Sequence, residues 1–599
     1  MENNNNSSVQ YVLDREGSKK ITGFASIDRP WLKYYDVLPE DIKVPDLSLY
    51  EFIYDNNKNN LQNYALNYYH NRVTYVSMFD KVSKLAYQYS KLGIKKGEDV
   101  PICMLSTPEL VYSFLALNKI GAVPCMINPA NGIVRLREHL KTTNAKYLIT
   151  GDIFSNQINE VINDTFIDNV IEFTFANSMP NNMLKLKTKA KLKLGLPTIK
   201  CRGDLIDGDK LLNEKITGYH RPTATHEEND VCAKVYTSGT TGNPKAIMLS
   251  NKNFVSMMIE YSLMGVKMER GEKFMSVIPP FFPYGICNSI CVPLSLGLET
   301  VLIAKFDATI FPKVFMEYKP QHINGVPKYY VRLMSDPVSK DADISFFKNA
   351  GCGGAGINAE DTLKVHEYFR THGSKAILNN GYGASETASA ATVQTDTCHK
   401  MGSVGIPLIL SDVSIFKKGT DEELSYLEKG EGEVCISGPT VMLGYHDNEE
   451  KTKKALKLHK DGKIWYHTED KGYMDEDGEL FIIGRYGRLI LRRGMSINPN
   501  DIEEELSKLD ELEKVVVEKE ADPEFVEVPV ACLKLKSGVN EQEVLAKLNQ
   551  ICKDTLPPYA WPHNYYKLDD VPYLSGDKID HVTIENNIKN KVYTKILKK

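Results

Sequence analysis

Between Val100 and Thr150 the chain alternates short apolar segments with helical ones, and this alternation limits the possible folds more than any other feature. The runs VPICML, AVPCMI and KYLIT have the length and composition of buried strands, while PELVYSFLALNKI and VRLREHL have helical spacing. Alternating strands and helices predict a mostly parallel sheet. Because such sheets bind ligands beyond the carboxyl ends of their strands, motifs that follow predicted strands are the first candidates for a functional site.

Size and composition predict a globular protein of two or three domains. The chain has 599 residues, several times the usual size of one domain, and 42% of them are hydrophobic while 25% are charged. These values exclude a mainly disordered, collagen-like or coiled-coil chain. The 73 basic and 78 acidic residues give a net charge of −5, so no overall basic field attracts nucleic acid or an anionic membrane, and any anion site must be local.

Cysteine usage and the N-terminal residues predict a cytoplasmic protein. The eleven cysteines are an odd number without CxxC pairs, which favours reduced thiols over a disulfide framework or structural zinc. The start, MENNNNSSVQ, lacks the basic and apolar regions of a signal peptide. Since no uninterrupted apolar run reaches about 18 residues, we expect no membrane span.

The segment VCAKVYTSGTTGNPKAIMLS predicts a phosphate-binding loop, because it passes from an apolar strand into hydroxyls and glycines that end at a lysine. Glycines let backbone N–H groups approach an oxyanion, hydroxyls add donors, and the lysine adds a positive charge. It is not a Walker loop, because Pro244 precedes the lysine and Ala246 follows it. The candidate residues are Thr237, Ser238, Gly239, Thr240, Thr241, Gly242 and Lys245.

With this loop, the sequence resembles the adenylate-forming superfamily of acyl-CoA synthetases, luciferases and peptide-synthetase adenylation domains, and most of all an acyl-CoA synthetase. The stretch VTYVSMFDKVSKLAYQYSKLGIKKGEDV is similar to the family's N-terminal signature, and further motifs follow in the family's order. The resemblance implies an α/β fold: a large N-terminal domain with mostly parallel sheets and flanking helices, and a small mobile α+β C-terminal domain. We expect a partly flexible leader over residues 1–45, the large domain over 46–486 and the small one over 487–599.

The resemblance also implies the residues around the adenine and the metal. The motif NNGYGASETA is similar to the segment whose aromatic ring covers adenine and whose acid helps hold magnesium, which gives these roles to Tyr382 and Glu386. The motif GCGGAGI matches a glycine-rich loop beside the base. The further nucleotide-binding residues implied are Gly354, Ala355, Gly356, Gly383, Ser385 and Thr387.

Two motifs nearer the C-terminus imply the ribose site and the catalytic lysine. In IWYHTEDKGYMDEDGELFIIGR, Asp470 matches the acid that holds the ribose hydroxyls, and Arg485 closes the site. The motif VPYLSGDKIDH is similar to the family's loop with the catalytic lysine, here Lys578. Implied catalytic residues are therefore Lys578, Thr237, Glu386 and Lys245.

Three positions depart from the family pattern. Glu469 stands where relatives have glycine, Arg488 occupies the expected hinge position, and Asp577 is inserted before the lysine. A non-catalytic nucleotide-binding protein is therefore an alternative hypothesis. The intact charged residues argue against it, and they are Lys245, Glu386, Asp470, Arg485 and Lys578.

The implied reaction consumes ATP with Mg²⁺, forms an acyl-adenylate with release of pyrophosphate, and transfers the acyl group to a thiol. Arg492, Arg493 and Gly494 lie where relatives meet the thiol donor, and guanidinium groups suit the 3′-phosphate of CoA. The alternative acceptor is the phosphopantetheine of a carrier protein acting in trans. A luciferase-like oxygenase shares the scaffold, but no residue specifically supports it.

The substrate is predicted to be a small-molecule fatty or aryl acid. In SVIPPFFPYGICNSI, Pro283 replaces the acidic anchor of α-amino-acid adenylators, and a buried ammonium without a carboxylate partner would be costly. The candidate pocket residues are apolar or small, and they are Phe282, Gly285, Asn288, Val326, Asn380, Gly381 and Ala388.

One segment has no place in this chemistry. Between Phe173 and Lys200, alternate lysines from Lys185 to Lys193 suggest a basic face. The simplest interpretation is a solvated charged insertion, and a membrane or partner site is the alternative.

Overall fold

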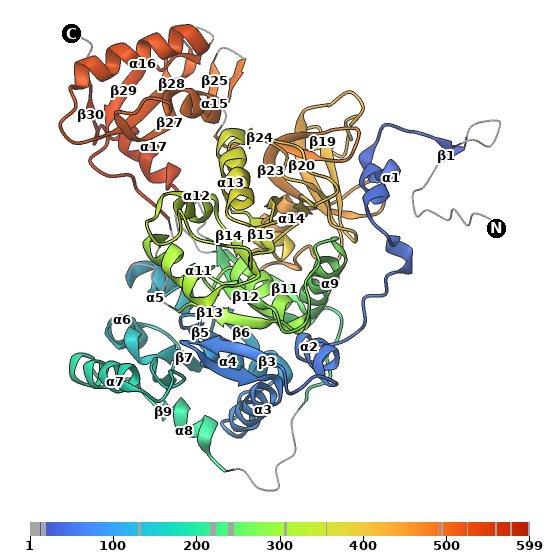
Figure 1. Ribbon diagram of the computed structural model, residues 1–599, viewed down its shortest axis with the longest axis vertical. Helices are drawn as coiled ribbons and strands as arrows, with labels where there is room; N and C mark the ends of the chain where they lie inside the picture. Colours follow the sequence, from blue (N-terminus) through green and yellow to red (C-terminus); the bar gives the residue numbers. More distant parts are fainter. Residues whose placement is uncertain are drawn as a thin grey trace.

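The chain folds into two large sheets with helices around them, a smaller antiparallel sheet, and a separate C-terminal sheet (Figure 1). This computed structural model describes residues 12–13, 19–129, 133–215, 223–237, 245–304, 308–354, 356–488, 490–492, 495–523, 525–556, 560–574 and 578–596. The short N-terminal hairpin consists of β1 (Val12–Leu13) and β2 (Lys19–Lys20).

The first large sheet confirms the predicted alternation. Its strand order is β21-β11-β10-β6-β5-β7-β8-β9, and the run from β6 to β9 is parallel. The elements are β5 (Asp99–Cys103), α4 (Pro108–Lys119), β6 (Val123–Met126), α5 (Ile133–Lys141), β7 (Tyr147–Gly151), α6 (Ser155–Val161), β8 (Asn169–Phe173), α7 (Met183–Gly195), β9 (Leu205–Asp207), α8 (Gly208–Asn213), β10 (Val231–Thr237), β11 (Lys245–Ser250) and β21 (Gly444–Tyr445).

The second large sheet has the order β18-β17-β16-β15-β14-β12-β13-β3-β4, with its centre parallel. Parallel strands need crossover connections, and helices supply them here. The elements are β3 (Tyr64–Tyr68), β4 (Asn71–Thr74), β12 (Lys273–Ser276), the π-helical turn η5 (Tyr284–Cys291), β13 (Glu299–Leu302), α11 (Phe311–Tyr318), β14 (His322–Gly325), α12 (Pro327–Ser335), β15 (Asn349–Cys352), α13 (Ala359–Thr371), β16 (Leu378–Tyr382), β17 (Thr392–Val393) and β18 (Ile406–Pro407).

A common core of helices joins the two large sheets. Leu110 and Phe114 on α4, Phe254 on α9 (Asn251–Leu263) and Ile290 on η5 are buried in one cluster, together with α2 (Leu49–Asn57), α3 (Tyr75–Lys91) and α10 (Val292–Ser295). Helix α4 begins where Thr107 Oγ1 accepts from Leu110 N at 3.3 Å. Since α4 is buried on all sides, it suits a position between two sheets.

A smaller antiparallel sheet borders the candidate functional site described below, and it also contacts the N-terminal segment. It contains β19 (Asp412–Phe416), β20 (Gly432–Ser437), β22 (Leu456–Leu458), β23 (Ile464–Met474) and β24 (Leu480–Arg485), and α14 (Glu449–Ala455) lies beside β21 and β22. Trp31, in the segment that follows α1 (Ala25–Asp28), is buried in its core. Part of the predicted leader is thus packed against the large domain.

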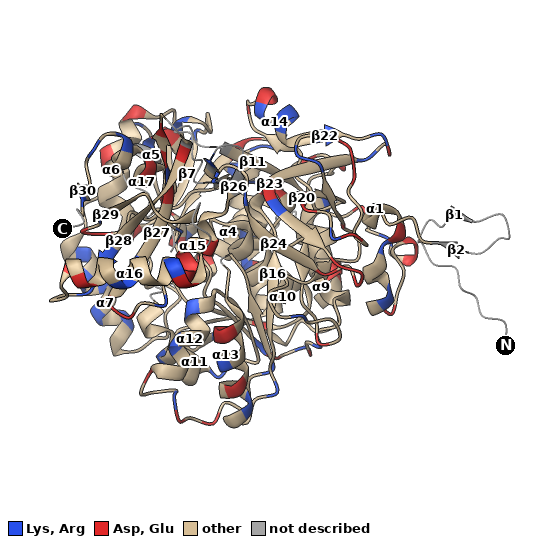
Figure 2. Ribbon diagram, turned by 90° about the horizontal axis from the view of Figure 1, so that it is seen from above, with Lys and Arg blue, Asp and Glu red and all other residues tan. Residues whose placement is uncertain are grey.

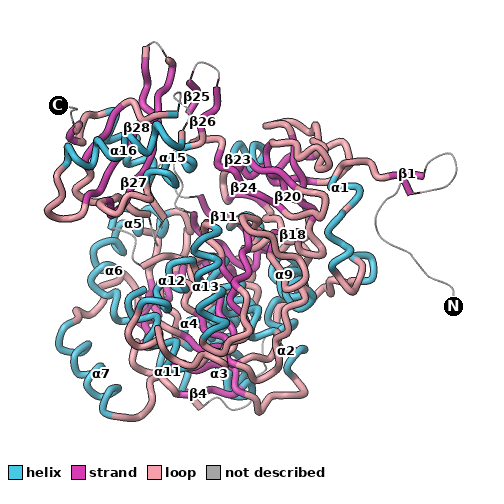
Figure 3. Tube along the Cα trace, turned by 45° about the horizontal axis from the view of Figure 1, so that its top comes forward, coloured by secondary structure: helices cyan, strands magenta, loops and turns pink. Residues whose placement is uncertain are grey.

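The C-terminal sheet has a hydrophobic core of its own and stands at one end of the molecule (Figures 1 and 3). The predicted domain boundary after residue 486 stays a prediction, and it falls between β24 and β25. The elements are β25 (Ile490–Arg492), β26 (Met495–Ile497), α15 (Pro499–Leu506), β27 (Leu512–Asp522), β28 (Val526–Leu535), α16 (Glu541–Thr555), β29 (Asn564–Lys567), α17 (His581–Lys589) and β30 (Thr594–Lys595).

Charged side chains of both signs are mixed on the surface, and the cysteines form no disulfide bonds. Figure 2 shows Lys and Arg interspersed with Asp and Glu over the face seen from above. All eleven cysteines are free thiols. Within the ranges given above, none of the helices combines the length and the apolar composition needed to cross a bilayer.

A buried carboxyl group connects α9 to the strands of the antiparallel region. Glu260 is fully buried and accepts hydrogen bonds from Leu410 N at 3.1 Å and from Ser411 Oγ at 2.9 Å. Burial raises the pKa of Glu260 to about 8. The carboxyl group is therefore largely protonated in the folded protein at neutral pH.

This pKa predicts how stability depends on pH. The pKa of Glu260 is higher in the folded protein than in the unfolded chain. Its stabilising contribution to the free energy of unfolding is therefore complete below about pH 4.5 and is lost as pH rises through about 8. We expect Glu260→Gln, which cannot ionise, to match the parent near pH 4.5 and to be more stable by on the order of 1–3 kcal/mol at pH 9. Urea unfolding of both proteins at the two pH values measures this. An equal pH response of the two proteins would contradict it.

Candidate functional site

The carboxyl ends of four neighbouring strands form the centre of the candidate site. Strands β12, β14, β15 and β16 are parallel neighbours, so the loops after them meet at one edge of the sheet. The predicted adenine residues follow β15 and β16, and predicted pocket residues follow β12 and β14. The fold thus brings together motifs that are up to about a hundred residues apart in the chain.

Asp470 is held by partners from two sheets. Tyr382 Oη, at the end of β16, donates to Asp470 Oδ2 at 2.6 Å. Arg485 lies opposite Asp470 in the β23–β24 pair, with its Nε 3.7 Å from Oδ1. Burial raises the pKa of the Asp470 carboxyl group, while Arg485 and Lys578 oppose that rise. The predicted adenine, ribose and closing residues therefore form one contiguous group.

Glu386 lies beside this group, buried in the turn η7 (Ser385–Thr387). Its Oε1 accepts from Tyr445 Oη at 2.8 Å, and its backbone oxygen accepts from Met442 N at 2.8 Å. Sequence reasoning missed Tyr445, because only the pairing of β21 with β11 brings it next to Glu386.

Lys578 extends from the C-terminal sheet toward the same carboxylates. Leu574 N donates to its backbone oxygen at 2.7 Å, which joins the two ends of the loop that carries Asp577. Desolvation and then the charge of Arg485 lower the pKa of Lys578, against the opposing effects of Asp470 and Glu386. Its side chain keeps exposed surface.

The predicted phosphate loop lies mostly outside the described residues. Ser238, Gly239, Thr240, Thr241 and Gly242 are not described, nor are the side chains of Thr237 and Lys245. The ends of the loop are defined, because Thr237 pairs with Lys245 across the β10–β11 hairpin. Strand β11 also lies beside η7, so the loop begins next to Glu386.

The glycine-rich segments of the site contain positions that tolerate no side chain. A Cβ on Gly383 would lie 1.9 Å from the backbone oxygen of Ser389. Gly354 has φ +77°, in the left-handed region that favours glycine. Gly356 has open space around it, and Ala355 lies outside the described residues. Ser385 is half-buried, while the fully buried Thr387 bonds back to Ala384.

The proposed acid pocket lies along the same edge. Phe282 is half-buried and packs edge-on against Phe281, with ring centroids 4.8 Å apart. Asn288 is fully buried, and its Nδ2 donates to Tyr261 Oη at 2.7 Å. A Cβ on Gly285 would lie 1.9 Å from the backbone oxygen of Pro279. Val326, Asn380, Gly381 and Ala388 occupy the ends of β14 and β16 or the turn after them.

The predicted hinge residue belongs by its contacts to the C-terminal sheet. Arg488 Nη1 donates to Asn500 Oδ1 at 3.0 Å, and its Nη2 donates to Glu503 Oε1 at 2.8 Å and to the backbone oxygen of Val517 at 3.0 Å. The guanidinium group therefore fixes the start of the linker to α15 and β27. Arg492 stacks on Phe525, whereas Arg493 and Gly494 lie outside the described residues.

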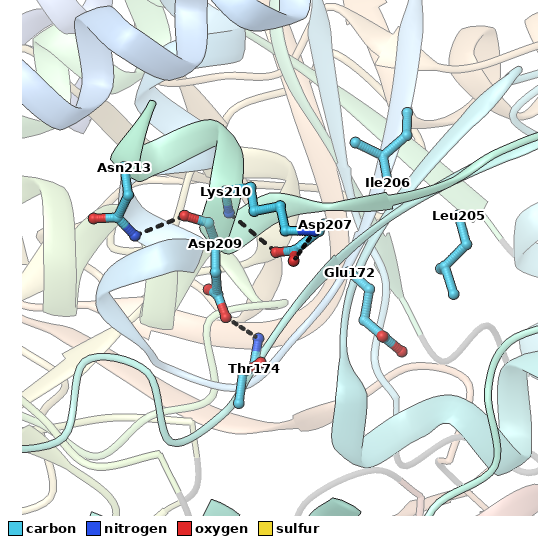
Figure 4. A pocket seen from close by; sticks show the side chains of 8 residues that line it. All are labelled: Glu172, Thr174, Leu205, Ile206, Asp207, Asp209, Lys210 and Asn213. Atoms are coloured by element: carbon cyan, nitrogen blue, oxygen red, sulfur yellow. Dashed lines mark hydrogen bonds and ion pairs between the residues drawn. The ribbon is translucent and has the colours of Figure 1, made fainter. Parts of the chain in front are cut away.

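A pocket far along the first sheet contains none of the predicted site residues (Figure 4). It lies at the edge formed by β8, β9 and α8 and has an acidic lining. The lining residues are Glu172, Thr174, Leu205, Ile206, Asp207, Asp209, Lys210 and Asn213.

Glu469 has a backbone conformation that favours glycine. Its φ is +63°, which explains why this position, next to the predicted ribose residue Asp470, is glycine in the resembled family. Glu433 stabilises the turn, because its Oε1 accepts from Glu469 N at 3.1 Å and its Oε2 lies 2.9 Å from Nδ1 of the buried His467. Sequence reasoning missed Glu433 and His467, since they face each other only across β20 and β23.

The strain at this position predicts a stabilising substitution. We expect Glu469→Gly to unfold with a free energy about 1 kcal/mol higher than Glu469→Ala, because glycine adopts positive φ without steric cost. Both variants lose the same exposed contact with Lys454, so the comparison isolates the backbone. Chemical denaturation measures the difference, and equal stability of the two variants would contradict the account.

Comparisons with known proteins agree with this geometry. The AMP-binding enzyme family matches residues 54–446. The long-chain-fatty-acid–CoA ligase of Bacillus subtilis (strain 168) is 27% identical over 568 residues, which cover 92% of this chain and 96% of that protein. A probable 4-coumarate–CoA ligase 2 of Dictyostelium discoideum is 28% identical, covering 78% of this chain and 82% of that protein.

Solved structures share the fold over nearly the whole chain. The anthranilate CoA ligase AuaEII in complex with anthranoyl-AMP superposes with a TM-score of 0.77 at 18% identity, covering 93% of this chain and all of that one. ATP-bound MatB from Rhodopseudomonas palustris gives a TM-score of 0.74 at 19% identity, covering 91% of this chain and all of that one. The fold, and the family match over most of the chain, show that this protein belongs to the AMP-binding enzyme family.

Proposed function

We propose that this protein is an AMP-forming acid–thiol ligase that activates a carboxylic acid with ATP and transfers the acyl group to CoA. The observation that carries the proposal is the convergence of Lys578 with Asp470, Arg485 and Glu386, from three different sheets, at one edge. The relatives named above are ligases for a long-chain fatty acid and for 4-coumarate, which supports the same reaction class here.

In the first half-reaction, a carboxylate oxygen of the acid attacks the α-phosphorus of ATP, and the bond to pyrophosphate breaks. Two anions must approach each other, so the site has to supply positive charge. Lys578 is suited to lie between the carboxylate and the α-phosphate. Asp470 can accept both ribose hydroxyls, and Tyr382 flanks the base. The loop from Thr237 to Lys245 is the proposed cradle for the phosphates.

Mg²⁺ is part of this proposal, and the donor set fits it. Glu386 offers a buried carboxylate whose Oε1 is oriented by Tyr445, and carboxylate oxygens are the ligands that hard divalent cations prefer. Glu386 would hold the ion. When bound, Mg²⁺ neutralises charge on the triphosphate.

In the second half-reaction, the thiol sulfur attacks the carbonyl carbon of the acyl-adenylate, its proton is lost, and AMP leaves. Because Lys578 and the thiol donor cannot both contact the reacting atoms in one small site, we propose that the C-terminal domain, residues 487–599, rotates about residue 488 between the two steps. Arg488 bonds to α15 and β27 of that domain and would move with it. The proposed CoA contacts are Arg492, Arg493 and Gly494.

We propose a fatty or aryl acid as the substrate. The pocket residues Phe282, Gly285, Val326 and Ala388 offer no carboxylate that could pair with a substrate ammonium group. A panel of fatty, aryl and amino acids, assayed for acid-dependent pyrophosphate release, tests this. Release with amino acids alone would contradict it, and thioester formation with a carrier protein but not with CoA would replace the proposed acceptor.

Lys578→Ala tests the division of labour between the half-reactions. We expect acid-dependent pyrophosphate release to fall by about 100- to 1,000-fold, because the variant lacks the charge that offsets two approaching anions. Thioester formation from supplied acyl-adenylate and CoA should stay within about threefold of the parent. Lys589→Ala, at an exposed position of α17, is the control and should change neither rate. Equal losses in both half-reactions would refute the assignment.

The lowered pKa of Lys578 predicts the pH dependence of adenylation. The lysine acts in its protonated form, so activity is present below its pKa and lost above it. We expect the alkaline limb of kcat/KM for pyrophosphate release to lie below pH 10.5, the ordinary lysine value. Lys578→Arg stays charged at higher pH, so its alkaline limb should move to higher pH, whether or not the variant releases pyrophosphate as fast as the parent. An unmoved limb would show that another group titrates.

A further inference from the structure

Helix α7 turns an apolar stripe toward solvent. Met183 and Leu186 are each 64% exposed and Leu194 is 90% exposed, although large apolar side chains are usually buried. Together with Ala190 they follow the spacing i, i+3, i+7 and i+11, which places them on one face of a helix. The helix begins at a defined cap, where Asn182 Oδ1 accepts from Leu184 N at 3.1 Å.

The opposite face of α7 rests on the protein. Lys185, Thr188 and Leu192 are its half-buried residues, and Leu192 packs against the core cluster that joins the large sheets. These three positions also share one face at helical spacing. The exposed leucines therefore cannot be explained as an incompletely buried core face.

Lysines border the stripe on both sides. In a helix, Lys187 and Lys191 fall on one flank of the stripe, and Lys189 and Lys193 fall on the other. The sequence expectation of a single face of alternate lysines was therefore wrong, because the segment is a helix and alternate residues do not share a face. From Met183 to Gly195 there is no acidic residue, so the helix is a local basic patch on a chain of net charge −5.

Acidic groups lie near the flank of the helix that carries Lys189. Lys189 acts on the carboxylates of Asp152 and Asp209, and Asp209 lines the acidic pocket of Figure 4. Among the described residues, no ion pair is recorded for Lys187, Lys191 or Lys193. Those three charges stay available to a partner.

We propose that α7 is a docking surface for an anionic membrane. The stripe of Met183, Leu186, Ala190 and Leu194 enters the boundary between headgroups and acyl chains, and the flanking lysines contact anionic headgroups. Helix α7 lies at the periphery of the molecule in Figures 1 and 3, away from the C-terminal domain, so a flat surface can reach it. An apolar stripe between two rows of lysines complements such a surface, because the stripe matches the acyl-chain region and the lysines match the anionic headgroups. This inference does not depend on the proposed reaction.

Vesicle co-flotation of the full-length protein tests the proposal. We expect binding to vesicles of phosphatidylcholine with about one third phosphatidylglycerol to exceed binding to phosphatidylcholine alone by at least tenfold. The triple variant Met183→Ser/Leu186→Ser/Leu194→Ser should lower the partition coefficient at least tenfold. Lys187→Glu/Lys191→Glu/Lys193→Glu should lower it by about 100-fold or more, because each lysine near an anionic surface contributes about a fivefold factor.

A matched control separates α7 from general surface hydrophobicity. Leu363, Leu427 and Leu458 are 57%, 53% and 73% exposed on other elements, so Leu363→Ser/Leu427→Ser/Leu458→Ser should bind as the parent does. Thermal unfolding checks that all variants are folded; if the stripe variant is not, Leu194→Ser alone replaces it, and Lys191→Glu alone replaces an unfolded lysine variant. Equal binding to both vesicle types, an unaffected stripe variant, or an equal loss in the control would each overturn the proposal.

Discussion

Asp470 and Tyr382 lie 88 residues apart in the chain, and the hydrogen bond between them is the contact on which the site depends. It joins the carboxyl end of a parallel strand to an antiparallel sheet that has a different core. Arg485 then completes the group from the neighbouring strand, in register with Asp470.

The junction also explains how a C-terminal residue takes part. Asp470 and Glu386 place two carboxylates at one edge, and Lys578 approaches them from the C-terminal part of the chain. The guanidinium group of Arg488 donates to residues of α15 and β27, while its backbone N–H donates to the backbone oxygen of Arg485 at 2.9 Å, so this residue contacts both sides of the linker. In the proposed mechanism, a rotation about this residue lets Lys578 serve the first half-reaction and leave before the second.

Sequence reasoning could predict local elements and linear motifs. The strands and helices from Val100 to Thr150 were predictable because their apolar periodicity is strong. Tyr445 and Glu433 were not, because their roles arise from pairing across strands that the sequence does not reveal. The predicted basic face of alternate lysines before Gly195 was wrong in its spacing, because the chain there is a helix capped by Asn182 and alternate residues of a helix do not share a face.

A departure from a family pattern need not mean loss of function. Glu469 keeps the positive φ of the glycine that it replaces, and Glu433 holds its N–H, so Asp470 keeps its position at a cost of about 1 kcal/mol. Asp577 lies outside the described residues, although Leu574 N donates to the backbone oxygen of Lys578 across this segment. The first of these departures is therefore accommodated locally.

The central claim is that these residues surround one nucleotide, and a crystal structure with a non-hydrolysable acyl-adenylate mimic tests it most directly. The account predicts the ribose hydroxyls on Asp470, the base beside Tyr382, and Nζ of Lys578 about 3 Å from an acyl or phosphate oxygen. A mimic bound at another edge of the sheets, with Asp470 and Lys578 both out of its reach, would contradict it.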